Sequence, residues 1–138
     1  MSSRFAQLRR ACLAFPGAQA DRKWGNVDTM LVRRKMFAVF ILDEQQKPVD
    51  FWFNAGNDRF LELTDQPGFR PAPYMGRWHW VSTRTPQTMT LPVWQPLLRA
   101  SWERVVRKLP KYQQSELGVE PTATRRSVSS IRAAGTNR

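Results

Sequence analysis

The 138-residue sequence predicts one α+β domain, in which helices near both ends cover one face of an antiparallel β-sheet. Apolar residues recur at helical spacing in residues 3–15 and again in residues 92–109. Between them, residues 30–53 contain short apolar runs separated by polar turns, as antiparallel strands do. This order of a helix, several strands and a helix is typical of the α+β class.

The first helix is predicted over residues 3–15. Its apolar stripe consists of Phe5, Leu8, Cys12 and Phe15. Ser2 or Ser3 can cap its start, and Pro16-Gly17 stops it. The residues that follow, up to Asp28, are expected to form a loop.

Three strands are expected next. Residues 30–32 and 36–42 are separated by the cationic turn Arg33-Arg34-Lys35, and residues 49–53 follow a polar turn. Because residues 36–42 are apolar at successive positions, that strand is predicted to lie centrally in the sheet.

A short helix is predicted over residues 57–64, with Asn57 as its cap. Residues 66–76 are rich in Pro and Gly and are expected to form an ordered loop. The next strand is predicted over residues 78–83, with Trp78 and Trp80 on the core side.

The last helix is predicted over residues 92–109, although Pro92 and Pro96 make its start uncertain. Its cations form a stripe that we interpret as a solvated face: Arg104, Arg107, Lys108 and Lys111. The sequence therefore predicts a domain over residues 1–112. Residues 113–138 are expected to be a flexible basic tail, because they hold too little apolar surface to offset the entropy of ordering.

The charge balance indicates an anionic partner. The chain has 22 Lys and Arg against 11 Asp and Glu, a formal net charge of +11. Such a field attracts phosphate, anionic lipid or an acidic protein, and a basic protein without such a partner is the plain alternative. Cys12 is the only cysteine, so no internal disulfide can form. No apolar run reaches the roughly 18 residues of a membrane span, and Arg9 and Arg10 interrupt any signal-peptide core. We predict a cytoplasmic protein.

Four segments, in this order and spacing, resemble the MmcQ/YjbR family: FPGAQADRKWG (15–25), KMFAVF (35–40), RPAPYMGRWHW (70–80) and VVRKLPK (105–111). The resemblance covers about residues 5–112. It implies a CyaY-like (frataxin-like) fold, also grouped with secretion-chaperone-like folds. It also implies a bacterial protein labelled DNA-binding, with a double-wing arrangement.

The chain departs from the family pattern at two places. Members commonly carry glycines at the hairpin tip where this chain has Arg33-Arg34, which makes this tip more basic. They also commonly carry a histidine where this chain has Tyr74. The second departure argues against chemistry by a pair of histidines.

The first candidate site is the cationic turn of Arg33, Arg34 and Lys35. A tight hairpin turn prefers Asn, Asp or Gly, whose backbones tolerate positive φ. The arginines therefore indicate either a longer, looser tip or a use for their charge on a phosphate backbone. An exposed turn that merely aids solubility is the alternative, and the sequence does not decide between them.

A second candidate site interleaves cations with aromatic side chains. Its members are Arg70, Tyr74, Arg77 and His79. Arginine can contact phosphates while aromatic rings stack on exposed bases. Arg22 and Lys23 could extend this positive surface if their loop lies near the hairpin tip. Trp24 beside them is expected to be structural.

Enzymatic and metal chemistry are not expected. One His and one Cys cannot supply a usual transition-metal site, and no phosphate-cradling glycine loop is present. Cys12 and His79 could pair as nucleophile and base, but Cys12 lies on an apolar stripe, which is typical of an inert thiol. The predicted first helix contains no carboxylate, so the fold relationship does not imply iron binding. We predict no cofactor, no metal and no catalysis.

Two functions are consistent with the sequence. The first is DNA binding, with phosphate contacts made mainly by Arg33, Arg34, Lys35, Arg70 and Arg77. The second is a protein-interaction or chaperone-like module that takes a peptide or acidic protein on a sheet face or edge. A membrane surface is not expected as a partner, and we predict a monomer.

Overall fold

A computed structural model of the chain describes residues 3–119, which fall into two units that divide between residues 106 and 107. The elements of the first unit are α1 (Arg4–Leu13), β1 (Ala18–Lys23), β2 (Val27–Val32), β3 (Lys35–Leu42), β4 (Pro48–Asn54), α2 (Asn57–Thr64), β5 (Phe69–Pro71), η1 (Gly76–Trp78), β6 (Trp80–Thr83), η2 (Pro86–Thr88) and α3 (Leu91–Val106). The described part of the second unit contains α4 (Lys111–Glu116).

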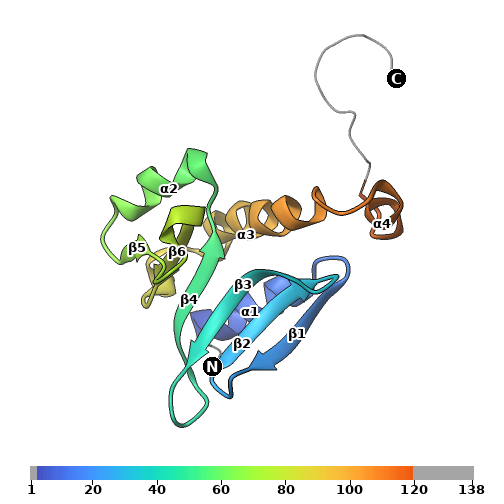
Figure 1. The fold of residues 1–138 in the computed structure, drawn as a ribbon. Coiled ribbons are helices and arrows are strands. Elements are labelled where there is room, and N and C mark those ends of the chain that lie inside the picture. Colours follow the sequence, from blue (N-terminus) through green and yellow to red (C-terminus); the bar gives the residue numbers. More distant parts are fainter. Residues whose placement is uncertain (1–2, 120–138) are drawn as a thin grey trace. The chain divides into compact units, whose positions relative to one another are not determined.

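The six strands form one antiparallel sheet in the order β1-β2-β3-β4-β6-β5 (Figure 1). Helices α1 and α3 lie against one face. The buried ring of Trp94 on α3 meets Phe51 and Phe53 of β4 edge-on, with ring centroids 5.6 and 5.3 Å apart. The predicted α+β fold, with both terminal helices of the domain on one face, is confirmed.

The start of the chain folds largely as its sequence indicates. Helix α1 is capped by Ser3, whose hydroxyl accepts a hydrogen bond from the Ala6 amide at 3.1 Å. Leu8 and Cys12 of its apolar stripe are fully buried. The loop expected after Gly17 is wrong, because Ala18–Lys23 is the edge strand β1. Its middle residues are all exposed, so the segment lacks the alternating pattern that would reveal a strand.

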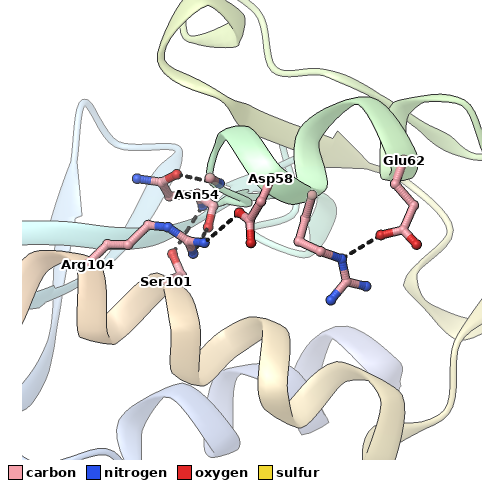
Figure 2. A network of polar contacts seen from close by, with 7 residues as sticks. Asn54, Asp58, Glu62, Ser101 and Arg104 are labelled. Carbon is pink, nitrogen blue, oxygen red and sulfur yellow. Dashed lines mark hydrogen bonds and ion pairs between the residues drawn. The ribbon is translucent and has the colours of Figure 1, made fainter. Parts of the chain in front are cut away.

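A β-bulge in β3 is closed by a serine from α3. The β2–β3 register shifts between Met30 and Leu31, which leaves Phe37 opposite no residue of β2. The Ser101 hydroxyl donates to the Phe37 carbonyl and accepts from the Asn54 amide at 3.1 Å. One buried hydroxyl thus links the bulge to the end of β4, and Figure 2 shows its contact with Asn54.

Arg104 joins α3 to the start of α2 (Figure 2). Its guanidinium donates to the Asn54 carbonyl at 3.2 Å and to the Asp58 carboxylate at 3.4 Å. The interpretation of Arg104 as part of a solvated charge stripe is therefore wrong. Asn57 is not the cap of α2 either, because the helix begins after Gly56, which has φ +77°.

Helix α3 accommodates Pro96 and ends at Val106, three residues before the predicted end. The predicted domain boundary after residue 112 differs from the unit boundary after residue 106. Helix α4 occupies residues where the tail was expected to begin. The rest of that predicted tail, residues 120–138, lies outside the described residues.

The second face of the sheet carries a smaller apolar cluster. Val39, Ala72 and Trp80 are buried there. Four partly buried side chains pack around them: Val27, Ile41, Trp52 and Met75. We call this the outer face. Among residues 3–119, no helix is long and apolar enough to cross a bilayer.

Candidate nucleic-acid interface

The β2–β3 hairpin turns within two residues. Val32 and Lys35 are the last paired residues, so Arg33 and Arg34 form the whole turn. Their φ angles are 49° and 70°. Positive φ at both central positions is the requirement of a type I′ turn, for which Asn-Gly is preferred. Of the two alternatives that the sequence left open, the longer, looser tip is excluded. Two arginines occupy a conformation that costs L residues about 1–3 kcal/mol each.

The hairpin tip, which we define as Arg33, Arg34 and Lys35, is exposed to solvent. No carboxylate occurs between Asp28 and Asp43 in the sequence. Strained backbone conformations cluster at functional sites, where the side chains contact a ligand. The tip is therefore the strongest local indication of a site for an anion.

Residues 72–79 connect β5 to β6, and we call them the aromatic loop. Tyr74 is 97% exposed and Trp78 is 58% exposed. The predicted strand over residues 78–83 begins only at Trp80, because residues 76–78 form the turn η1. Trp80 is buried as expected, but the core position predicted for Trp78 is wrong.

Arg77 and His79 precede strand β6, so their side chains do not alternate between the two faces of the sheet. The Arg77 guanidinium lies 5.0 Å from the centre of the Trp78 ring, a cation–π distance. His79 has φ 68° and is half-buried, with its ring edge-on to Phe60 at 5.4 Å. Arg77 therefore faces solvent beside an exposed indole, whereas His79 helps to anchor the loop.

The hairpin tip and the aromatic loop lie at the same end of the sheet. Strand β4 is antiparallel to β3, so it ends at Asn54 where β3 begins. Asn54 in turn pairs with Trp80, the first residue of β6. With neighbouring strands about 4.8 Å apart, β3 and β6 lie about 10 Å apart on either side of β4, and the hairpin tip extends beyond the last β3–β4 pair, Ala38 and Phe53. One strand of duplex DNA carries one phosphate charge per about 3.4 Å of helix axis, so a backbone segment of several phosphates could reach both.

Arg22 and Lys23 belong to the other end of the sheet. Lys23 pairs with Val27 at the start of β2, and Arg22 donates to Gln46 in the β3–β4 turn. Lys23 also forms an ion pair with Asp21 at 3.0 Å. In the strand pairing these cations therefore lie at the opposite end of the sheet from the hairpin tip. Trp24, expected to be structural, is 83% exposed beside them.

Lys23 nevertheless shares one feature with the hairpin tip. It lines a shallow groove of about 470 Å³, and Arg34 lines the same groove. The remaining lining residues are Gln19, Ala20, Asp21 and Leu31. Asp21 places a negative charge in this groove, which makes it less suited to phosphate than the tip itself.

Arg70 is held by a buried carboxylate that the sequence analysis did not single out. It donates to Asp50 at 3.0 Å and to the Ser82 hydroxyl at 3.2 Å. Ser82 donates to the other Asp50 oxygen at 2.7 Å, and Arg84 lies 3.8 Å from the carboxylate. The sequence did contain a signal for this contact, since Asp50 lies within the apolar segment 49–53. A buried Asp requires polar partners, so its position predicts a nearby cation or hydroxyl.

Other reactive groups are also engaged or buried. Burial raises the pKa of the Cys12 thiol far above its ordinary value, and the nearby charge of Arg9 opposes this only partly. A protonated thiol is a poor nucleophile. Within residues 3–119, no three His, Cys, Asp or Glu side chains gather closely enough to hold a metal ion.

The chain is a small antiparallel α+β domain with cationic side chains exposed at one end of its sheet. The chain belongs to the YjbR family, whose model matches residues 13–104. The predicted MmcQ/YjbR membership is thereby confirmed. The match begins within α1 and ends within α3.

One solved structure shows the same fold. The crystal structure of Deinococcus radiodurans protein DR2400, described as a DUF419 domain, has a TM-score of 0.69 and 23% sequence identity. The alignment covers 83% of this chain and 88% of that one. No curated protein matches the chain significantly.

Proposed function

We propose that the protein is a cytoplasmic, non-enzymatic, DNA-binding protein that grips the phosphate backbone at one end of its sheet. The observation that carries this proposal is the shared location of the hairpin tip and the aromatic loop. The cations expected to contact phosphates are Arg33, Arg34, Lys35 and Arg77. Arg70 is left out of this set because it is bound to Asp50.

Charge complementarity supports the proposal. The segment between Asp65 and Glu103 contains four arginines and no carboxylate, and the segment between Asp28 and Asp43 likewise has only cations. Asp58, which lies at the start of α2 near this end of the sheet, is contacted by Arg104. A phosphate backbone would therefore meet mainly positive charge here.

Binding to duplex DNA over a salt series tests the proposal. We expect Arg33→Asn/Arg34→Gly to flatten the slope of log K against log salt by about 1.8, since each phosphate contact contributes about −0.9. Arg22→Gln/Lys23→Gln is the matched control, because it removes the same charge from the other end of the sheet. The arginines beyond the described residues are present in every variant, so the comparison isolates position.

The control should keep the wild-type slope. Equal flattening in both variants would indicate a general effect of net charge and would contradict a site at the hairpin tip. No binding of the wild-type protein to either duplex or single-stranded DNA at low salt would overturn the proposed function.

A second candidate function is suggested by the outer face. The indole nitrogen of Trp52 and the hydroxyl of Thr29 are buried there without a hydrogen-bond partner in the described residues. An extended peptide could cover the partly exposed apolar side chains of this face. A peptide array probed with wild-type protein and with Ile41→Lys tests this function. Capture that the substitution abolishes would support a peptide site, and no capture would contradict it.

A further inference from the structure

The aromatic loop presents two large rings to solvent. Tyr74 is 97% exposed and Trp78 is 58% exposed, whereas the neighbouring Trp80 is 6% exposed. Burying such side chains is favourable, and exposed aromatic residues that gather in one place commonly mark a binding surface. Tyr74 and Trp78 are therefore suited to bind a ligand with flat, apolar faces.

The loop is held in a fixed conformation. The Met75 amide donates to the Ala72 carbonyl at 3.1 Å, and the Met75 carbonyl accepts from the Trp78 and Trp80 amides at 3.0 and 3.3 Å. Met75 itself packs against the outer-face cluster. A Cβ on Gly76 would lie 2.9 Å from the Pro71 side chain, so this position has little room for another residue. Two aromatic rings on a tied loop lose little freedom when they bind a ligand.

Cations accompany both rings. Arg77 lies against the Trp78 ring at 5.0 Å, and the hairpin tip occupies the same end of the sheet. Nucleotides present a flat base and a negative phosphate together, which matches this combination of side chains. In a duplex the faces of the bases are stacked on one another, so only unpaired bases can meet an aromatic ring.

We propose that the aromatic loop stacks unpaired bases on Tyr74 and Trp78, which makes single-stranded nucleic acid the preferred ligand of this surface. The inference rests on the proposed function, because the hairpin tip supplies the phosphate contacts. Stacking of this kind tolerates any base, since every base has an aromatic face.

The test first compares three labelled DNA ligands at low salt with the full-length protein: a dT 12-mer, an abasic 12-mer with the same phosphates, and a 12-base-pair duplex. Each stacked base is expected to tighten binding by about 5- to 150-fold. The dT 12-mer should therefore bind at least about fivefold more tightly than the abasic strand. A second comparison extends the test to ribose, with a uridine RNA 12-mer and an abasic RNA strand. Tighter binding of the uridine strand would also support stacking.

Tyr74→Asn/Trp78→Ala should abolish the preference for dT over the abasic strand. Asparagine is chosen because position 74 has φ 64°, which asparagine tolerates. Trp24→Asn is the matched control, since it removes an exposed indole from the other end of the sheet at a position that also has positive φ, 53°, and should retain the preference. Circular dichroism should show that each variant is folded.

Equal affinity of the wild-type protein for the dT and abasic strands would overturn stacking and leave the proposed phosphate contacts standing. A preference that survives in Tyr74→Asn/Trp78→Ala would also overturn it. Absence of binding to all three ligands would overturn the proposed function and this inference together.

Discussion

The guanidinium of Arg104 occupies the place where Gly56 would carry a Cβ. An added Cβ would lie 2.2 Å from a terminal nitrogen of Arg104 and 2.5 Å from its central carbon. Gly56 also has φ +77°, so it is required both by backbone conformation and by the close approach of a side chain. This contact closes α3 onto the junction of β4 and α2, next to the proposed interface (Figure 2).

Gly56→Ala should destabilise the fold by about 2–3 kcal/mol. The backbone strain accounts for about 1 kcal/mol, and displacement of Arg104 from Asn54 and Asp58 accounts for the rest. Gly25→Ala is the matched control, because Gly25 has the same φ of +77° and nothing within 4 Å of the added Cβ. Urea denaturation should show about 1 kcal/mol for the control. Equal losses in the two variants would contradict a role for the Arg104 contact.

Arg33→Asn/Arg34→Gly should stabilise the protein by about 1–2 kcal/mol, since Asn-Gly adopts the type I′ turn without the strain of two arginines. The same variant is expected to bind DNA more weakly. Thermal denaturation would measure the stability, with Arg22→Gln/Lys23→Gln as the control for net charge. A destabilised variant would contradict the view that the arginines are retained at the expense of turn stability.

Arg70 and Arg77 should differ in what they support. Arg70→Ala removes a partner from the buried Asp50 and should destabilise the fold by about 1–2 kcal/mol, with Ser82 still bonded to the carboxylate. Arg77→Ala should change stability by less than about 0.5 kcal/mol and weaken DNA binding. Denaturation and anisotropy measured on both variants would check this. The opposite pattern would place the phosphate contact at Arg70.

Cys12 should make stability fall at alkaline pH. Burial raises the pKa of its thiol, so the folded state keeps a proton that the unfolded state releases above about pH 8.5. The contribution of the Cys12 thiol to the free energy of unfolding is complete below that pH. Above it, this contribution declines by up to about 1.4 kcal/mol per pH unit. Comparing denaturation of wild type and Cys12→Ala between pH 7.5 and 10 isolates this effect from other titrating groups. Parallel curves would contradict it.

Much of the fold could be predicted because long apolar patterns determine it. The helix expected over residues 57–64 matches α2, and the central strand expected over residues 36–42 matches β3 apart from its first residue. Strand β1 was not predicted, because an exposed edge strand is stabilised mainly by backbone pairing with β2 rather than by buried side chains. Sequence periodicity carries no information about such a strand.

The candidate site was predicted in its parts and not in its arrangement. The hairpin tip was located correctly between Val32 and the following strand, but its two-residue geometry contradicts the turn preferences of arginine. Trp78 was misplaced because the left-handed conformation of His79 separates η1 from β6, and histidine gives no strong signal of that conformation. The proximity of the two segments depends on pairing between distant strands, which local sequence does not encode.

The most direct test of the proposed interface is an amide chemical-shift titration of the isotope-labelled protein with a short DNA strand. The proposal predicts that amides of residues 33–35 and 74–79 shift together with one dissociation constant, whereas those of residues 22–26 do not move. Shifts confined to residues 22–26, shifts confined to the outer face around Val39 and Trp52, or no shifts at low salt would contradict it.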